Sequence, residues 1–171
     1  GEKSISIGDS SSATGKNSIA IGGASGANLD NSVALGSRSR TSTNAVTVTS
    51  AKVGDITYGG FAGTVSSVGS QISVGDTKNE RQIKHVAAGT ISQESTDAIN
   101  GSQLFSTQNA LGNLASSTSS ALGGGSNVKP DGSLSLPTYV ITNNPKTSGT
   151  KVTVHTVGDA LSALDSAVNT G

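Results

Sequence analysis

The chain has 171 residues, of which 23 are glycine, two are Phe and two are Tyr, and it has no Trp, Met or Cys. This composition cannot supply an ordinary globular core of large side chains, and it excludes thiol chemistry and disulfides. Eleven basic residues balance eleven acidic ones, which gives no electrostatic footprint for nucleic acid or an anionic membrane. The chain has no secretory signal and no apolar run near the roughly 20 residues of a membrane helix, so we expect a piece of a longer protein.

The N-terminal part of the chain repeats every fourteen residues. Copies of one short motif, SISIG, SIAIG and SVALG, stand at 4–8, 18–22 and 32–36. A repeat this short predicts a stacked solenoid in which each rung has two short strands and two turns, with rungs about 4.8 Å apart. We expect less regular fourth and fifth copies at 44–49 and 71–75.

The aliphatic side chains of each copy share one face of an extended strand. We interpret this face as the inner core of a head at 1–77, and the opposite face, with Ser6, Ala20 and Ala34, as one that another strand layer or chain can approach. The predicted head core is Ile5, Ile7, Ile19, Ile21, Val33, Leu35, Val46, Val48, Ile72 and Val74.

The stretch at about 50–70 breaks the fourteen-residue period, which predicts an insertion looped out of the solenoid. It contains Tyr58 and Phe61, one of each pair of aromatic residues. These side chains form either a small hydrophobic staple against the rod or a protrusion that contacts a ligand.

A different motif, here called the neck, occupies 78–104. It contains RQI at 81–83, VAAG at 86–89, TDAIN at 96–100 and QL at 103–104. This pattern closely resembles the neck of trimeric autotransporter adhesins, and the repeats resemble the YadA-like heads of that family. The residues that carry the resemblance are Arg81, Gln82, Ile83, Val86, Gly89, Asp97, Ile99, Asn100, Gln103 and Leu104, with Ile99 in place of the usual Val.

Helical signals run from 96 to 122, where Ser95 or Thr96 can cap the start and three glycines follow the end. A small β-rich connector is expected at 123–156, with strands at 134–142 and 151–156 and a hairpin turn at 143–149. A second helix begins at 157 and runs to 171. Narrow apolar seams predict that both helices join coiled coils, formed by Leu104, Leu111, Leu114, Ala121, Val157, Leu161, Leu164 and Val168.

Candidate chemical sites are weak in this sequence. His85 and His155 fall on different predicted modules, and neither has the spacing of a zinc site. Glycine clusters at 59–63 and 123–125 lack the strand-loop-helix context of a phosphate site. Arg38 and Arg40 are interpreted as a solvated edge, with a contact to an acidic ligand as the alternative. We predict no catalytic residue, cofactor or metal.

The family resemblance implies a mainly β fold with coiled-coil helices: a trimeric left-handed parallel β-roll head, a neck, a short trimeric coiled coil and a small α/β connector. It also implies a homotrimer on the bacterial cell surface, held by an outer-membrane anchor outside these residues. Multivalent, non-catalytic binding to a host extracellular-matrix protein such as collagen, or to a cell-surface receptor, is the expected function.

Other readings of the sequence stay open. The segment could serve only as a structural spacer of the same fibre. A phage tail-fibre or capsule-binding spike is also trimeric and β-rich, but the acidic residues here are scattered and do not form the pair that glycan hydrolysis needs. An ice-binding solenoid needs flat ranks of Thr, whereas the outer positions mix Ser, Ala and Asn.

Overall fold

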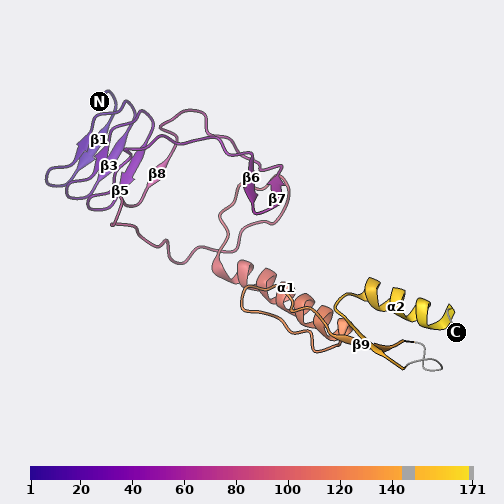
Figure 1. The fold of residues 1–171 in the computed structure, drawn as a ribbon. Helices are drawn as coiled ribbons and strands as arrows, with labels where there is room; N and C mark the ends of the chain where they lie inside the picture. The colour runs from indigo at the N-terminus through magenta and orange to yellow at the C-terminus, as the bar shows by residue number, and fades with distance from the viewer. Residues whose placement is uncertain (144–148, 170–171) are drawn as a thin grey trace. The chain divides into compact units, whose positions relative to one another are not determined.

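The computed structural model describes residues 1–143 and 149–169 (Figure 1). The chain divides into two compact units, Gly1–Asn100 and Gly101–Gly171. The first unit contains short β-strands followed by an extended segment, and the second contains two helices and a β-hairpin. Neither helix in the described ranges has the length and apolar character required to cross a membrane.

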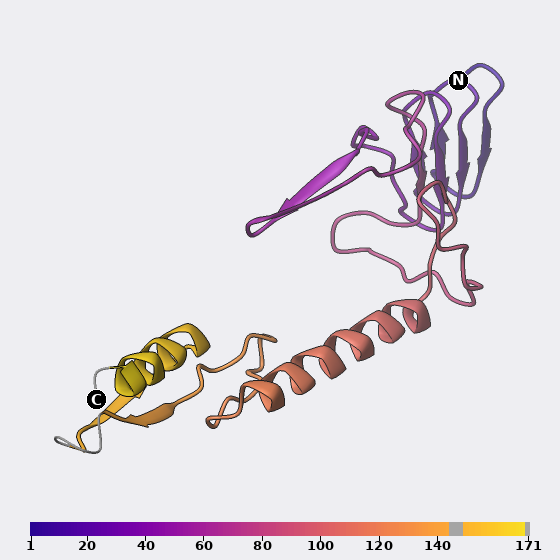
Figure 2. The same ribbon diagram turned by 90° about the vertical axis from the view of Figure 1, so that its right-hand side faces the viewer.

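The fourteen-residue repeat forms a parallel stack, as predicted. Strands β1 (Ile5–Ile7), β3 (Ile19–Ile21) and β5 (Val33–Leu35) pair in parallel, and partner residues are fourteen positions apart. Strands β2 (Ser12–Ala13) and β4 (Gly26–Ala27) pair in the same way to form a second, shorter sheet. The strands of the larger sheet lie side by side in both views (Figures 1 and 2).

A long insertion separates the third rung from the next strand of the same sheet. Strand β8 (Ile72–Ser73) pairs with β5, so that Val33 stands opposite Ile72, 39 positions later. The intervening chain contains an antiparallel hairpin formed by β6 (Ser50–Val53) and β7 (Ile56–Gly59). The predicted insertion is therefore present, and it begins earlier than residue 50.

The expected fourth copy at 44–49 does not form a rung. Val46 and Val48 belong to no strand, and their side chains are 68% and 49% exposed. The backbone N–H of Ala45 donates to the carbonyl oxygen of Val68 at 2.7 Å, which joins the two ends of the insertion instead of extending the stack. The fifth copy supplies the next strand, β8.

The interior of the roll is made of alanine and hydroxyl side chains, which corrects the predicted head core. Ile5, Ile7, Ile21 and Leu35 are between 37% and 57% exposed, and Ile72 is 69% exposed. A rung of fourteen residues brings its two sheets too close together for an Ile or Leu side chain, so the small residues face inward. The buried set is Ala13, Ala20, Ala27, Ala34, Ser18, Ser25, Ser32, Ser39 and Thr41.

Each buried serine hydroxyl is satisfied within its own turn. Ser18 and Ser32 donate at 2.6 Å to the carbonyl oxygens of Gly15 and Leu29, three residues earlier. Ser25 donates at 2.7 Å to the carbonyl of Gly22. No buried side-chain nitrogen or oxygen among the described residues lacks a hydrogen-bond partner. Serine therefore fills the narrow interior and fixes the turn without a desolvation penalty.

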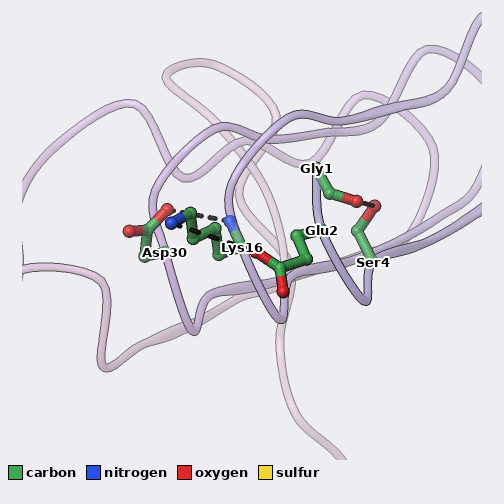
Figure 3. A network of polar contacts seen from close by, with 5 residues as sticks. All are labelled: Gly1, Glu2, Ser4, Lys16 and Asp30. Atoms are coloured by element: carbon green, nitrogen blue, oxygen red, sulfur yellow. Dashed lines mark hydrogen bonds and ion pairs between the residues drawn. The ribbon is translucent and has the colours of Figure 1, made fainter.

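Polar contacts also link successive rungs at the exposed turns (Figure 3). The backbone N–H of Lys16 donates to Oδ1 of Asp30 at 2.8 Å, and its Nζ lies 4.0 Å from Oε2 of Glu2. The two side chains of that ion pair are 67% and 66% exposed, so it contributes little to stability. The stack is stabilised mainly by the backbone hydrogen bonds between rungs.

The second unit contains helix α1 (Gly101–Leu122), strands β9 (Tyr139–Thr142) and β10 (Lys151–Val154), and helix α2 (Val157–Asn169). Strands β9 and β10 pair antiparallel, as the predicted connector requires. The hairpin turn expected at 143–149 lies mostly outside the described residues, as do positions 170 and 171 of the second helix.

Helix α1 starts later than the sequence predicts. The start at 96 is wrong, because Ser95 and Asp97 make contacts outside a helix. The carboxylate of Asp97 accepts a hydrogen bond from the backbone of Thr90 at 2.9 Å, and Oγ of Ser95 accepts one from the Asp97 N–H at 3.2 Å. Residues 95–100 belong to no helix or strand, and the helix begins at Gly101.

Replacing Ala20 with Leu tests the alanine interior. Ala20 is fully buried, so the larger side chain overpacks the roll and lowers the free energy of unfolding of the head by about 1–3 kcal/mol or more. Chemical denaturation followed by circular dichroism at a fixed protein concentration measures the change. The control is Thr14→Leu at the exposed position directly after β2, which should leave the midpoint nearly unchanged. An Ala20→Leu variant as stable as the parent would contradict the assignment.

Candidate functional site

The outward face of the larger sheet carries two columns of aliphatic side chains. Strand register places Ile5, Ile19, Val33 and Ile72 in one column and Ile7, Ile21 and Leu35 in the other. A continuous stripe of this kind is uncommon on a surface that stays in water, and it indicates a protein interaction surface. We call these seven side chains the aliphatic face.

The two halves of the neck motif are brought together by polar contacts. Besides the bond between Thr90 and Asp97, Nδ2 of Asn100 donates to the carbonyl oxygen of Val86 at 3.0 Å. A Cβ placed on Gly89 would lie only 2.2 Å from the carbonyl oxygen of Ala98, so glycine is required there. VAAG and TDAIN therefore form one folded loop, which explains why both appear in the same pattern.

The apolar side chains of the neck are exposed in the single chain. Ile83, Ile91 and Ile99 are 70%, 74% and 58% exposed. Ile91 is not among the predicted neck residues, although a large apolar residue between the VAAG and TDAIN segments is a usable signal. These three side chains add further apolar surface within the first unit.

The side chains of the predicted coiled-coil seams are also exposed among the residues that the structure describes. Leu104, Leu111 and Leu114 on α1 are 53–65% exposed, and Ala121 is exposed. On α2, Val157, Leu161, Leu164 and Val168 are 46–76% exposed. Phe105, which the seam analysis left out, is 68% exposed beside Leu104. The pairing of these side chains across chains stays a prediction.

The two histidines belong to different units of the chain. His85 belongs to the first unit, and Nδ1 of His155 in the second lies 3.1 Å from the carbonyl oxygen of Pro137. Arg40 folds over the backbone of Gly26, where an added Cβ would come within 2.9 Å of Nη1. Within the described parts of the chain, no three His, Cys, Asp or Glu residues gather as a metal site would need.

The contact between Asp97 and Thr90 has a predictable pH dependence. The backbone N–H of Thr90, followed by its hydroxyl, donates to the carboxylate and lowers the pKa of Asp97 below its ordinary 3.8. The stabilisation is therefore complete above pH 3.8 and is lost as the pH falls through the lowered pKa. In a pH titration followed by NMR, the amide shift of Thr90 should report a midpoint below 3.8. Asp97→Asn should abolish this titration, and a flat Thr90 signal in the parent would refute the contact.

Two family models match parts of this chain. Residues 1–25 and 13–39 match two copies of the YadA head domain repeat. Residues 82–127 match the coiled stalk of trimeric autotransporter adhesins, a range that includes most of the neck motif and all of α1.

Curated relatives match over part of the chain. It is 42% identical over 91 residues to the autotransporter adhesin EhaG of Escherichia coli O157:H7, covering 53% of this chain and 5% of that protein. It is 38% identical over 109 residues to the trimeric autotransporter adhesin AtaA of Acinetobacter sp. strain Tol 5, covering 63% and 3%. The autotransporter adhesin BtaE of Brucella suis biovar 1 is 47% identical over 75 residues, covering 44% and 10%. The chain thus spans a tenth or less of each relative.

A solved structure has a related fold. The C-terminal YadA-like domain of BPSL2063 from Burkholderia pseudomallei aligns with a TM-score of 0.59 and 42% identity, covering 70% of this chain and 53% of that one. The family matches, the relatives and this structure agree with the stacked repeats, the neck and the helix. The chain belongs to the trimeric autotransporter adhesins, as a segment that carries YadA head repeats and part of the coiled stalk.

Proposed function

We propose that three copies of this segment associate through the aliphatic face and that the resulting rod attaches to a host extracellular-matrix protein or a cell-surface receptor. The family is non-catalytic, exposed on the cell surface and anchored in the outer membrane, and it implies a homotrimer. The observation that carries the proposal is the aliphatic face itself, since a single chain leaves its largest side chains in water.

Burial of the aliphatic face supplies the stability that one chain lacks. Full burial of a Val, Leu or Ile side chain contributes about 1.5–3 kcal/mol. The interior of the roll contains only Ala, Ser and Thr side chains, which bury much less apolar area each. Because the columns run along the roll in register, copies can pack along its whole length. The exposed neck isoleucines extend the apolar surface beyond the last strand.

The ligand-facing surface is then formed by the turns and the second sheet. Asp9, Lys16, Asp30 and Arg38 are exposed on the turns of successive rungs, among short polar side chains. Such groups make weak individual contacts. Three copies on one rod raise the effective concentration of each weak site, so attachment can be strong without a deep pocket.

Association through the aliphatic face is tested by the double variant Ile21→Asn and Leu35→Asn. Three copies of each amide would lie in an apolar interface, and we expect the trimer to dissociate. Light scattering should show the mass fall from about three times 16.7 kDa toward 16.7 kDa. Thr14→Asn places the same amide at the exposed position directly after β2 and should leave the trimer intact. A trimer of unchanged stability in the double variant would contradict the proposed interface.

Attachment is tested with surfaces coated with collagen, laminin or fibronectin and with cultured host cells. We expect the parent trimer to bind at least one of them, with an apparent affinity about 100-fold or more above that of the dissociated variant. A parent trimer that binds none of them would favour the alternative function, a structural spacer that holds other parts of the fibre away from the cell.

A further inference from the structure

We propose that Arg81, assisted by Asn79, is a latch that closes the open end of the β-roll and fastens the neck to it. The side chains of the latch take the place of the backbone that another rung would have supplied. This inference concerns the conformation of the head and does not depend on the ligand proposed above.

The hydrogen bonds between rungs end on the latch. A turn follows each strand of the larger sheet, and the turns of successive rungs are linked by backbone hydrogen bonds. The N–H of Ala24 donates to the carbonyl oxygen of Asp9 at 2.8 Å, and the N–H of Arg38 donates to the carbonyl oxygen of Gly23 at 2.9 Å. The next acceptor in this fourteen-residue series is the carbonyl of Ser37. It accepts hydrogen bonds from Nη2 of Arg81 at 2.7 Å and Nδ2 of Asn79 at 3.2 Å.

The glycine at the same turn of each rung also marks the place of the latch. A Cβ on Gly8 would meet the backbone of Gly22, and a Cβ on Gly22 would meet the backbone of Gly36. A Cβ on Gly36 would instead lie 3.0 Å from Cζ and Nη1 of Arg81. The guanidinium therefore occupies the position that backbone atoms occupy one and two rungs earlier.

The geometry of the guanidinium suits this task. Its Nη1 donates to the carbonyl oxygen of Val74 at 2.8 Å and to Oγ of Ser39 at 2.9 Å, while Nη2 reaches Ser37. A planar fork can serve several acceptors at once, which a lysine ammonium on a flexible stem does less well. One side chain thus ties the third rung to the segment after β8.

The end of the roll is otherwise open. A hollow of about 460 Å³ adjoins Arg81 there, lined also by Arg40, Thr43, Asp76 and Glu80. The lining carries both positive and negative side chains, so no apolar packing covers this end of the roll at the hollow. Because Arg81 belongs to the neck and begins its RQI segment, the neck cannot separate from the head without breaking the latch.

Hydrogen exchange on the full chain in its assembled form tests the latch. Arg81→Met keeps a long stem but removes every donor, and it should speed exchange of the Gly36 and Arg38 amides about tenfold or more, since bonds to a charged donor are lost. The amides of Gly22 and Ala24, one rung away, should keep the parent rate. Lys84→Met, at an exposed neck position, is the matched control and should change neither set.

Two further variants make the test independent of a general loss of stability. Asn79→Ala should produce the same local effect with a smaller size, because it removes one of the donors to Ser37. Arg81→Lys should restore protection only in part. The latch is refuted if Arg81→Met leaves the third rung protected, if both rungs exchange faster together, or if lysine restores the parent rate in full.

Discussion

The narrow interior of the roll is the constraint from which the other features follow. Two sheets joined within a fourteen-residue rung leave room for a methyl group or a hydroxyl between them, and Ala20 and Ser32 show both solutions. Larger apolar side chains must point outward. A chain built in this way has a small core in which the polar groups of the described residues are hydrogen-bonded. Its large aliphatic side chains can contribute to stability only when another molecule packs against them.

Sequence alone identified the period, the strands and the family, but it assigned the wrong face to the interior. Alternation shows that Ile19 and Ile21 share a face, and in most sheets the aliphatic face is the buried one. In this roll the small size of the side chain determines which face is buried. The strict recurrence of Ala or Ser at the intervening positions was the sequence signal for the buried face. The pattern around Val46 and Val48 was equally misleading, because alternation over six residues does not specify a partner strand.

The neck could be recognised from its residues but not explained by them. Asp97 suits the first turn of a helix, and only the structure shows that its carboxylate binds the Thr90 amide instead. Gly89 is required because the carbonyl of Ala98 passes too close for any side chain. Contacts between residues that are several positions apart along an extended chain leave no periodic trace in the sequence, so they could not be predicted. The presence of both helices was predictable because the spacing of apolar residues along a helix is a local signal, and the pairing of their seams across chains stays a prediction.

The insertion shows how a rod of this kind can vary without loss of order. Its two ends are joined by the bond between Ala45 and Val68, and Nε2 of Gln71 donates to the carbonyl of Thr43 at 2.7 Å. Strand β8 then pairs in parallel with β5 and continues the same sheet after the insertion. The conformational entropy lost on closing a loop grows only slowly with the length of the loop. The connection between β5 and β8 can therefore accept inserted segments of very different length and chemistry. Every rung before it keeps its register.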